Sequence, residues 1–503
     1  MKRISCGTTL RRRTIDELDT DLLTTLEENP TAVGGGCPAR SDGRRLTMMR
    51  ALRIAAAAAC CLSIVGCATL PDTDSLTERH AAQAARFEGA LGQLSEKRSA
   101  AIVANLKRKS GGLDILDKQL SLEQDIVGSP LVVGNKVTLL QDGPATYEAM
   151  FVAIRKAKDH INVESYIVDD DEVGRQFSEL LLARRAQGVQ VNLIYDSLGA
   201  FGTPKTFFDR LRQAGVQVLE FNPAVTRPWT LNNRDHRKLL VVDGRTAFLG
   251  GINISRVYSS GSSVRRSEGP ANATTGWRDT DVQIEGPVVA EFQKLFMQTW
   301  DKQHGKPLAQ KDYFPALAPR GKDIVRAIGS TPDDPFSLIY LTLISAITNA
   351  EKQVHITSAY FVPDPQLLKA LLDAAGRGVD VKLILPSQSD SKSAFYAGRS
   401  HYSKLLQGGV KIYERRGALL HVKAAIVDGV WSCVGSSNLD WRSALDNDEV
   451  NAVILGPEFA QQMQAAYAGD IGASDAIDLE SWEGRSLLLR MKEWTARLWW
   501  RLL

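Results

Sequence analysis

The stretch Asp235-His236-Arg237-Lys238-Leu239-Leu240-Val241-Val242-Asp243-Gly244 decides the fold of this chain, because a second stretch repeats its pattern. The second copy is Leu420-His421-Val422-Lys423-Ala424-Ala425-Ile426-Val427-Asp428-Gly429, and both copies fit H-x-K-x-x-x-x-D-G. Each continues into a Gly-rich segment that ends in Asn, first Gly250-Gly251-Ile252-Asn253 and then Gly435-Ser436-Ser437-Asn438. The 503 residues include seven His, so two His at the start of one pattern indicate an internal duplication.

Each motif predicts a β-hairpin with His and Lys near one end of a strand. Side chains alternate along a strand, so His236 and Lys238 share one face, and the second motif repeats this arrangement. Asp-Gly after an apolar run is a hairpin signal, which makes Asp243 and Asp428 predicted turn residues. As members of the duplicated pattern, both Asp also belong to the candidate catalytic set.

The segments around the motifs repeat as well. Gly188-Val189-Gln190-Val191 recurs as Gly378-Val379-Asp380-Val381, 378 − 188 = 190 residues later, close to the 421 − 236 = 185 residues between the two His. Strand and helix patterns alternate in both halves, which favours an α/β fold. We therefore predict two similar domains, residues 128–310 and 311–482, each a β-sheet flanked by helices and related to the other by a pseudo-two-fold axis.

The N-terminal region carries a processing signal. Met48-Met49-Arg50-Ala51-Leu52-Arg53 is basic, residues 54–65 are Ala-rich and apolar, and Ile64-Val65-Gly66-Cys67 resembles a bacterial lipobox. Residues 48–67 are thus predicted to be a lipoprotein signal peptide with lipidation at Cys67, which implies a membrane-anchored protein on the periplasmic side. A short buried helix is the alternative interpretation.

The segments that flank this signal and the repeats carry further expectations. Residues 1–47 are interpreted as a non-native extension from a start site placed too far upstream, and residues 68–127 as a tether followed by a helix over 78–109. Cys433, in an apolar strand, is predicted to be a small buried side chain. The Ser-, Gly- and Arg-rich stretch 259–275 is predicted to be a mobile loop.

The C-terminal segment 483–503 predicts an amphipathic helix. Its apolar face contains Leu487, Met491, Trp494, Leu498 and Leu502, flanked by Trp499, while Arg490, Lys492 and Arg497 lie away from that face. Two interpretations are open: a helix at a membrane surface, or a terminal helix packed on its own domain.

Two His-x-Lys copies together suit an anion better than a metal, because a Lys shares each strand face with its His. If the halves pack about a two-fold axis, two His, two Lys and the amides of Asn253 and Asn438 surround one tetrahedral phosphodiester. One imidazole then attacks phosphorus and forms a phosphohistidine, while the other protonates the leaving alkoxide. Asp279 and Glu449 are candidate carboxylates for orienting the two rings.

These residues make the chain resemble the phospholipase D superfamily, and most of all its bacterial cardiolipin synthase branch. The resemblance rests on His236, Lys238 and Asp243, on His421, Lys423 and Asp428, and on stretches such as Asn232-Asn233-Arg234-Asp235 and Val434-Gly435-Ser436-Ser437-Asn438. It implies phosphatidyl transfer through phosphohistidine without a metal or other cofactor. We place the nucleophile at His236 and the acid and base at His421.

Three functional readings follow. The first is a phosphatidyltransferase that makes cardiolipin from phosphatidylglycerol at a membrane surface, and the second a phospholipase D in which water is the acceptor. The third is an inactive lipid-anchored scaffold. The net charge of +3 gives no sign of a nucleic-acid partner, and a monomer is expected.

Overall fold

The computed structural model describes residues 85–113, 115–116, 119–120, 128–224, 226–227, 230–261 and 276–498. The chain divides into residues 1–68 and 69–503, and every described residue belongs to the second unit. The predicted extension 1–47, the signal peptide 48–67 with Cys67, and residues 262–275 of the predicted loop therefore lie outside the described residues.

The first half contains a sheet in the order β6-β5-β4-β8-β9-β11-β3. Its strands are β3 (Leu131–Gln141), β4 (His160–Ser165), β5 (Gln190–Asp196), β6 (Gln217–Phe221), β8 (Lys238–Val242), β9 (Thr246–Gly250) and β11 (Thr280–Glu285). Strands β4, β5 and β6 are parallel, and the other neighbours in this order are antiparallel. The helices are α5 (Asp142–Lys156), α6 (Glu172–Ala186), α7 (Lys205–Gln213) and α8 (Val289–Lys302).

The second half repeats this topology in the order β15-β14-β13-β17-β18-β19-β12. Its strands are β12 (Asp323–Ser330), β13 (Gln353–Ser358), β14 (Asp380–Pro386), β15 (Lys411–Arg415), β17 (Lys423–Val427), β18 (Trp431–Gly435) and β19 (Asn447–Leu455). Its main helices are α9 (Leu338–Asn349), α10 (Pro365–Gly376), α11 (Lys392–Arg399), α12 (Tyr402–Gln407), α13 (Trp441–Leu445) and α14 (Pro457–Gly472). The prediction of two similar α/β domains is confirmed.

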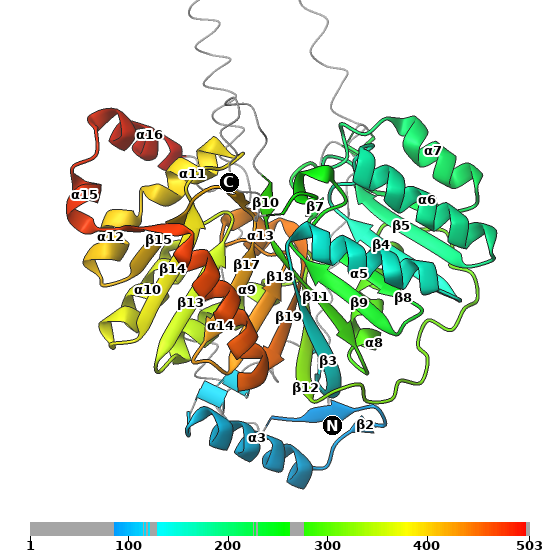
Figure 1. Ribbon diagram of the computed structural model, residues 1–503, viewed down its shortest axis with the longest axis horizontal. Coiled ribbons are helices and arrows are strands. Elements are labelled where there is room, and N and C mark those ends of the chain that lie inside the picture. The colour runs from blue at the N-terminus through cyan, green and yellow to red at the C-terminus, as the bar shows by residue number, and fades with distance from the viewer. Residues whose placement is uncertain are drawn as a thin grey trace, which may run out of the picture. The chain divides into compact units, whose positions relative to one another are not determined.

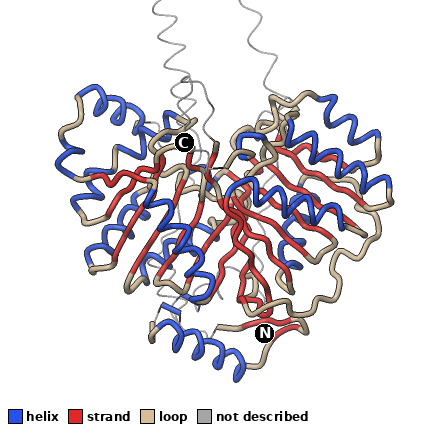
Figure 2. The backbone as a smooth tube through the Cα atoms, viewed as in Figure 1, coloured by secondary structure: helices blue, strands red, loops and turns tan. Residues whose placement is uncertain are grey.

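The two halves share one continuous sheet. Strand β3 pairs antiparallel with β12, and Figure 1 shows the halves side by side with these two strands between them. Figure 2 shows helices lying on both faces of the strands. The predicted boundary between residues 310 and 311 falls in the segment that connects α8 to β12.

Alternation along the first motif strand explains how both faces of the sheet become buried. Leu239 and Val241 belong to one core with Phe292, Phe296 and Trp300 of α8, whereas Leu240 and Val242 belong to another, with α5, α6 and α7. The first of these cores also contains Ile426 and Val434 of the second half. A single apolar interior therefore spans the junction and fixes the two motifs relative to each other.

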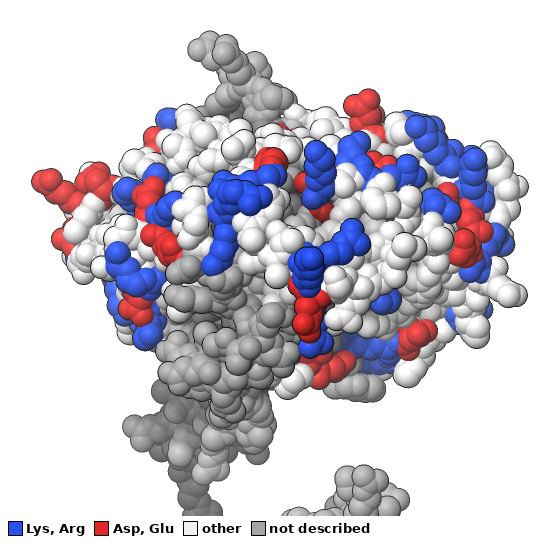
Figure 3. Space-filling model, turned by 90° about the horizontal axis from the view of Figure 1, so that it is seen from below, with Lys and Arg blue, Asp and Glu red and all other residues white. Residues whose placement is uncertain are grey.

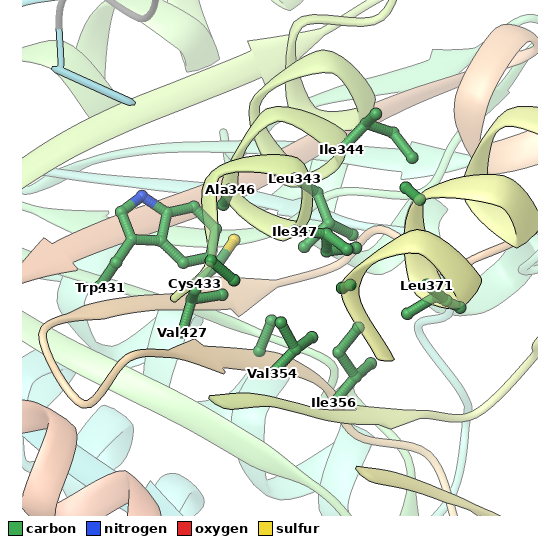
Figure 4. Packing of buried hydrophobic residues seen from close by; sticks show 14 of the residues in the cluster. Leu343, Ile344, Ala346, Ile347, Val354, Ile356, Leu371, Val427, Trp431 and Cys433 are labelled. Carbon is green, nitrogen blue, oxygen red and sulfur yellow. The ribbon is translucent and has the colours of Figure 1, made fainter. Parts of the chain in front are cut away.

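A further core lies under the second motif (Figure 4). Leu343 and Ile347 of α9 pack there with Val354 of β13, Val427 of β17 and Trp431 of β18. Cys433 is in the same cluster and is 6% exposed, which confirms its prediction as a small buried side chain.

The helix predicted over 78–109 is wrong over residues 85–95, while residues 78–84 lie outside the described part of the chain. Residues 85–94 contain a small hairpin of β1 (Phe87–Gly89) and β2 (Gly92–Gln93), and α3 begins only at Glu96 and ends at Ser110. The hairpin turns at Ala90 and Leu91, and Gly92 directly after the turn has a φ of +96°, which suits glycine. Ser95 caps the helix by accepting a hydrogen bond from the Arg98 N–H. Local turn and cap chemistry therefore outweighs the Ala-rich periodicity.

The C-terminal helix α16 (Leu487–Arg497) forms as predicted, after β20 (Ser474–Ile477) and α15 (Leu479–Glu483). Its large apolar side chains face away from the protein: Leu487, Leu488, Met491, Trp494 and Leu498 are 62–77% exposed. Trp499 and Leu502 lie outside the described residues. The helix does pack on its own domain, against α11, but it does so with the face opposite to its large apolar side chains.

Figure 3 shows basic and acidic side chains interspersed on the face that it presents, without a patch of one sign. Within the described part of the chain, no helix is long and apolar enough to cross a membrane.

Candidate active site

Each motif is led into its hairpin by a short strand that pairs with the opposite half. Strand β7 (Arg234–Asp235) lies parallel to the start of β19, and the His236 N–H donates to the Asp448 carbonyl at 2.9 Å. Strand β16 (Leu419–Leu420) lies parallel to β10 (Trp277–Arg278), and the His421 N–H donates to the Arg278 carbonyl at 2.8 Å. These reciprocal pairings place both His at the junction of the halves.

The carboxylate that orients His236 comes from the second half. Nδ1 of His236 lies 3.0 and 3.1 Å from the two carboxylate oxygens of Glu449, and the Ser436 hydroxyl also donates to that carboxylate. Burial alone would raise the pKa of Glu449, but the attraction of His236 and Lys238 lowers it to about 2. Because an ionised carboxylate can only accept, Nδ1 carries the hydrogen and Nε2 keeps its lone pair.

The carboxylate that orients His421 comes from the first half. Nδ1 of His421 lies 2.7 Å from Oδ2 of Asp279, and the Tyr258 hydroxyl lies 3.4 Å from the same nitrogen. Rings of Tyr258, Trp277 and Tyr360 surround the imidazole, with ring centres 5.8, 5.0 and 6.2 Å away. The sequence named both carboxylates, and the structure adds that each one crosses to the other half's His.

Burial disfavours the charged form of both imidazoles in the free protein. Burial lowers the pKa of His236 to about 4, and Glu449 only partly offsets this effect. Burial and the charge of Lys423 lower the pKa of His421, against the attraction of Asp279. Lys423 also lowers the pKa of His236, and Lys238 lowers that of His421, so the two motifs form one electrostatic site.

The two Lys occupy equivalent positions. Lys238 Nζ donates to the His236 carbonyl, and Lys423 Nζ donates to the His421 carbonyl, each at 2.6 Å. Burial lowers the pKa of Lys238 to about 7 and that of Lys423 to about 8. A bound anion would restore the charge of both, because a nearby negative charge favours the protonated amine.

Two tyrosines that the sequence analysis missed complete the pattern. Tyr166 follows β4 and lies against His236, with ring centres 5.2 Å apart, and Lys238 Nζ lies 5.3 Å from its ring centre. Tyr360 follows β13 and holds the equivalent place beside His421, with Lys423 Nζ 6.0 Å from its ring centre. A repeated signal was present, Tyr166-Ile167-Val168-Asp169 against Tyr360-Phe361-Val362-Pro363-Asp364.

The two Asn differ in what they contact. One amide N–H of Asn253 donates to the Tyr258 hydroxyl at 3.0 Å, and its oxygen accepts from the Ile167 N–H at 3.1 Å. Asn253 therefore positions Tyr258, and this role of Asn253 was not predicted from the sequence. Asn438 is 6% exposed, and its side-chain oxygen has no hydrogen-bond partner among the described residues.

Asp243 and Asp428 were grouped with the catalytic residues, but they lie at the opposite ends of the hairpin strands from His236 and His421. The Asp243 carboxylate accepts N–H groups from Lys158, Asp159 and His160. The Asp428 carboxylate does the same for residues 351, 352 and 353. Both adopt a left-handed conformation, with φ of +52° and +53°, as their prediction as turn residues requires.

The Gly-rich tail of the first motif leaves space for a carboxylate. A Cβ at Gly251 would lie 2.2 Å from a carboxylate oxygen of Asp279. Ser436 has the equivalent place in the second motif, and its hydroxyl contacts Glu449 instead. Within the described residues, no group of three or more His, Cys, Asp or Glu is arranged to hold a metal ion.

Comparison with known proteins agrees with this geometry. The family model described as "Cardiolipin synthase, PLD-like domain" matches residues 150–263 and 343–471, which contain one motif each. A cardiolipin synthase from Geobacillus sp. (strain WCH70) is 36% identical over 384 residues, which are 75% of this chain and 74% of that protein. The chain belongs to the cardiolipin synthase family of phospholipase D-like proteins.

Other relatives extend the family resemblance. The major cardiolipin synthase ClsA of Bacillus subtilis (strain 168) is 34% identical over 369 residues, which are 72% of this chain and 74% of that protein. The crystal structure of phosphatidylserine synthase from Haemophilus influenzae Rd KW20 superposes with a TM-score of 0.57 at 12% identity and covers 76% of this chain and 99% of that one. At this identity the superposition shows a shared fold.

Proposed function

We propose that this protein is a phosphatidyltransferase that acts on phospholipid phosphodiesters, with the synthesis of cardiolipin from two phosphatidylglycerol molecules as its reaction. The observation that carries the proposal is the crossed pair of oriented imidazoles, His236 with Glu449 and His421 with Asp279. Membership of the cardiolipin synthase family supports the same reaction class.

In the first step, Nε2 of His236 attacks phosphorus and forms a P–N bond. The bond from phosphorus to the glycerol oxygen of the head group breaks, and His421 gives its proton to that oxygen, so glycerol leaves. His421 must be protonated for this step, and an anionic phosphodiester between the rings raises its pKa from the depressed value of the free protein.

In the second step, the neutral His421 removes the proton from a hydroxyl of a second phosphatidylglycerol. The resulting oxygen attacks phosphorus, the P–N bond breaks, and His236 leaves with its lone pair restored. Lys238, Lys423, Asn438 and the remaining amide N–H of Asn253 stabilise the equatorial oxygens in this proposal. Asp279 and Glu449 act through the rings that they orient.

His236 is the proposed nucleophile because its pKa of about 4 keeps the imidazole neutral over the whole physiological range. Its Nδ1–H is bound by a carboxylate that the Ser436 hydroxyl also holds, so the ring presents Nε2 as a fixed lone pair.

The test is an incubation of the purified full chain with phosphatidylglycerol vesicles in EDTA, with products identified by mass spectrometry. We expect cardiolipin and glycerol from the wild type and neither from His236→Ala. Phosphatidic acid as the sole product would instead assign the chain as a phospholipase D with water as acceptor. No turnover in the wild type, or activity that survives His236→Ala, would remove the mechanism.

We also propose that Cys67 is lipidated and anchors the protein on the periplasmic side of a bacterial membrane. The motif Ile64-Val65-Gly66-Cys67 after a basic and apolar stretch supports this. Mass spectrometry of the N-terminal peptide from membranes should find an acylated Cys67, and Cys67→Ser should abolish the modification. An N-terminal peptide that retains residues upstream of Cys67 without acyl groups would contradict it.

A further inference from the structure

We propose that α16 and the loops beside His236 form one surface that docks on an anionic lipid bilayer, so that the catalytic site opens toward its lipid substrate. The proposal deepens the proposed function, because it says how that site meets its substrate. It rests on the position of the exposed apolar side chains.

Helix α16 has the opposite orientation to a usual surface helix: its large apolar side chains face outward, and polar and small side chains face the protein. Glu493, 2% exposed, points inward and is bound by Arg485, and Ala496 packs inward on Val362, Ala394 and Ala397. Directly opposite, Leu487, Met491 and Trp494 project outward with 62–77% exposure. Because the helix is attached to the protein through polar and small residues, its apolar face stays free to contact an apolar environment outside the protein.

The flanks of that apolar face are basic. At 100° per residue, Arg490 and Arg497 lie along one side of it and Lys492 lies beyond the other, where its ammonium rests over the Tyr396 ring. An apolar strip with Trp, bordered by Arg and Lys, matches the boundary between acyl chains and anionic head groups. The charges therefore select a bilayer with anionic lipids as the occupant.

Helix α16 also contacts the wall of the catalytic site. It packs on α11, and Ala496 belongs to the small apolar cluster that includes Tyr360, whose ring lies beside His421. The Tyr360 hydroxyl donates to Asp390, just before α11. The docking helix therefore lies at the edge of the catalytic site, which we call its rim. Figure 1 shows α16 and α11 in the same upper region as β7 and β10.

The opposite rim carries matching apolar side chains. Eleven large apolar side chains are exposed in the described part of the chain, and four of them, Leu198, Phe201, Leu231 and Val257, belong to loops of the first half next to the site. Asp196 ties two of these loops together, because it accepts the N–H of Leu198 and that of Asp235, which directly precedes His236. Val257 is adjacent to Tyr258. Together with the five of α16 on the other rim, these four make nine of the eleven side chains.

Trp494 gives a local readout of docking. We would measure the quenching of its fluorescence by phosphatidylglycerol vesicles with brominated acyl chains, as the difference between the full chain and its Trp494→Phe variant. We expect quenching with bromines near the head group, and a smaller effect in vesicles of phosphatidylcholine alone. This local probe reports docking even when a lipid anchor tethers the chain.

The functional test compares Met491→Glu/Trp494→Glu with a matched control, Leu91→Glu/Phe314→Glu, which changes the two exposed apolar side chains away from the rim. We expect the first variant to lose at least about tenfold in turnover of phosphatidylglycerol vesicles. Its turnover of dispersed short-chain phosphatidylglycerol should stay within about twofold of wild type, and the control should keep both.

Three results would overturn the proposal. Trp494 could stay unquenched by bromolipids, the variant could turn over vesicles like the wild type, or α16 could become shielded without lipid as protein concentration rises, which would mark a contact between two copies. Failure of the proposed function is distinguishable, because it would abolish turnover of both substrates in the wild type and leave the Trp494 quenching unaffected.

Discussion

The two His centres are built on the same scaffold but differ in their surroundings. His236 is held by a Glu that a Ser hydroxyl supports, and one tyrosine ring, Tyr166, lies against it. His421 is held by an Asp and enclosed by three aromatic rings. The duplicated fold therefore repeats the backbone and the His-Lys spacing, while the side chains around each ring differ.

The divergence at one matched position shows how this happens. Gly251 leaves space in which the Asp279 carboxylate approaches the backbone, whereas Ser436, its counterpart, adds a hydroxyl that donates to Glu449. The longer Glu449 side chain accepts hydrogen bonds from His236, Ser436 and the Asn447 amide, and its pKa is lowered to about 2. We interpret His236 as the nucleophile and His421 as the acid and base.

The largest effect should appear when a substrate with an activated leaving group is used to distinguish the roles of the two His. A phosphatidyl p-nitrophenyl ester needs no proton on its leaving oxygen, so His421→Asn should still release one equivalent of p-nitrophenol and then stall. His236→Asn should lose about 10⁵-fold or more in the same release. The burst is measured by stopped-flow absorbance, and alkaline quenching with peptide mapping should find the adduct on His236.

An adduct on His421 in the His236→Asn variant would reverse the assignment of the two rings. The double variant is the control, and it should give neither a burst nor an adduct.

The carboxylates should show the same asymmetry with a smaller effect. Glu449→Gln should lower kcat by about 10²- to 10⁴-fold with both phosphatidylglycerol and the activated ester, because Gln no longer fixes the hydrogen on Nδ1 of His236. Asp279→Asn should lower phosphatidylglycerol turnover by a similar factor but spare the burst with the activated ester. Equal losses of the burst in both variants would contradict separate roles.

Anion binding should weaken as pH rises. Burial lowers the pKa of Lys238 to about 7 and that of Lys423 to about 8 in the free protein, so the two Lys lose protons as pH rises through those values. The pKa of His421 is lowered as well. A bound anion raises their pKa, so binding takes up protons, and affinity should fall by up to about tenfold per pH unit for each proton taken up.

Isothermal titration with tungstate between pH 6 and 9, in buffers of different ionisation enthalpy, measures both the affinity and the proton uptake. Lys423→Met should reduce the uptake in the upper part of this range. An affinity that does not change with pH would show that the Lys stay charged in the free protein.

The smallest effect on chemistry should come from the two turn Asp. Asp428→Asn should lower the free energy of unfolding by about 1–3 kcal/mol, because an amide cannot accept all three backbone N–H groups. Asp243→Asn should cost less, since Asp243 is half-buried and Asp428 is 7% exposed. Denaturant titration measures the stability, and kcat per folded molecule should remain within about threefold of wild type.

A loss of kcat in Asp243→Asn without a loss of stability would return that residue to the catalytic set. The structure argues otherwise, because its carboxylate is engaged by the turn before β4.

The duplicated α/β framework and the His-Lys pairs could be predicted from the sequence alone, and so could the two carboxylates as candidates. Periodicity, turn signals and repeated spacing can be recognised along the chain without knowing which segments pack together. The sequence could not decide that Glu449 crosses to His236 and Asp279 to His421, because reciprocal strand pairing between halves depends on contacts more than 140 residues apart along the chain.

Two local predictions were incomplete, for different reasons. Residues 85–95 fit the helical periodicity, but they form the β1–β2 hairpin and the Ser95 cap, so the helix begins only at Glu96. The C-terminal helix has the same apolar face whether it packs inward or outward, and only Glu493 and Ala496, buried against Arg485 and α11, set its direction. A sequence records which residues share a face, and tertiary packing decides what that face meets.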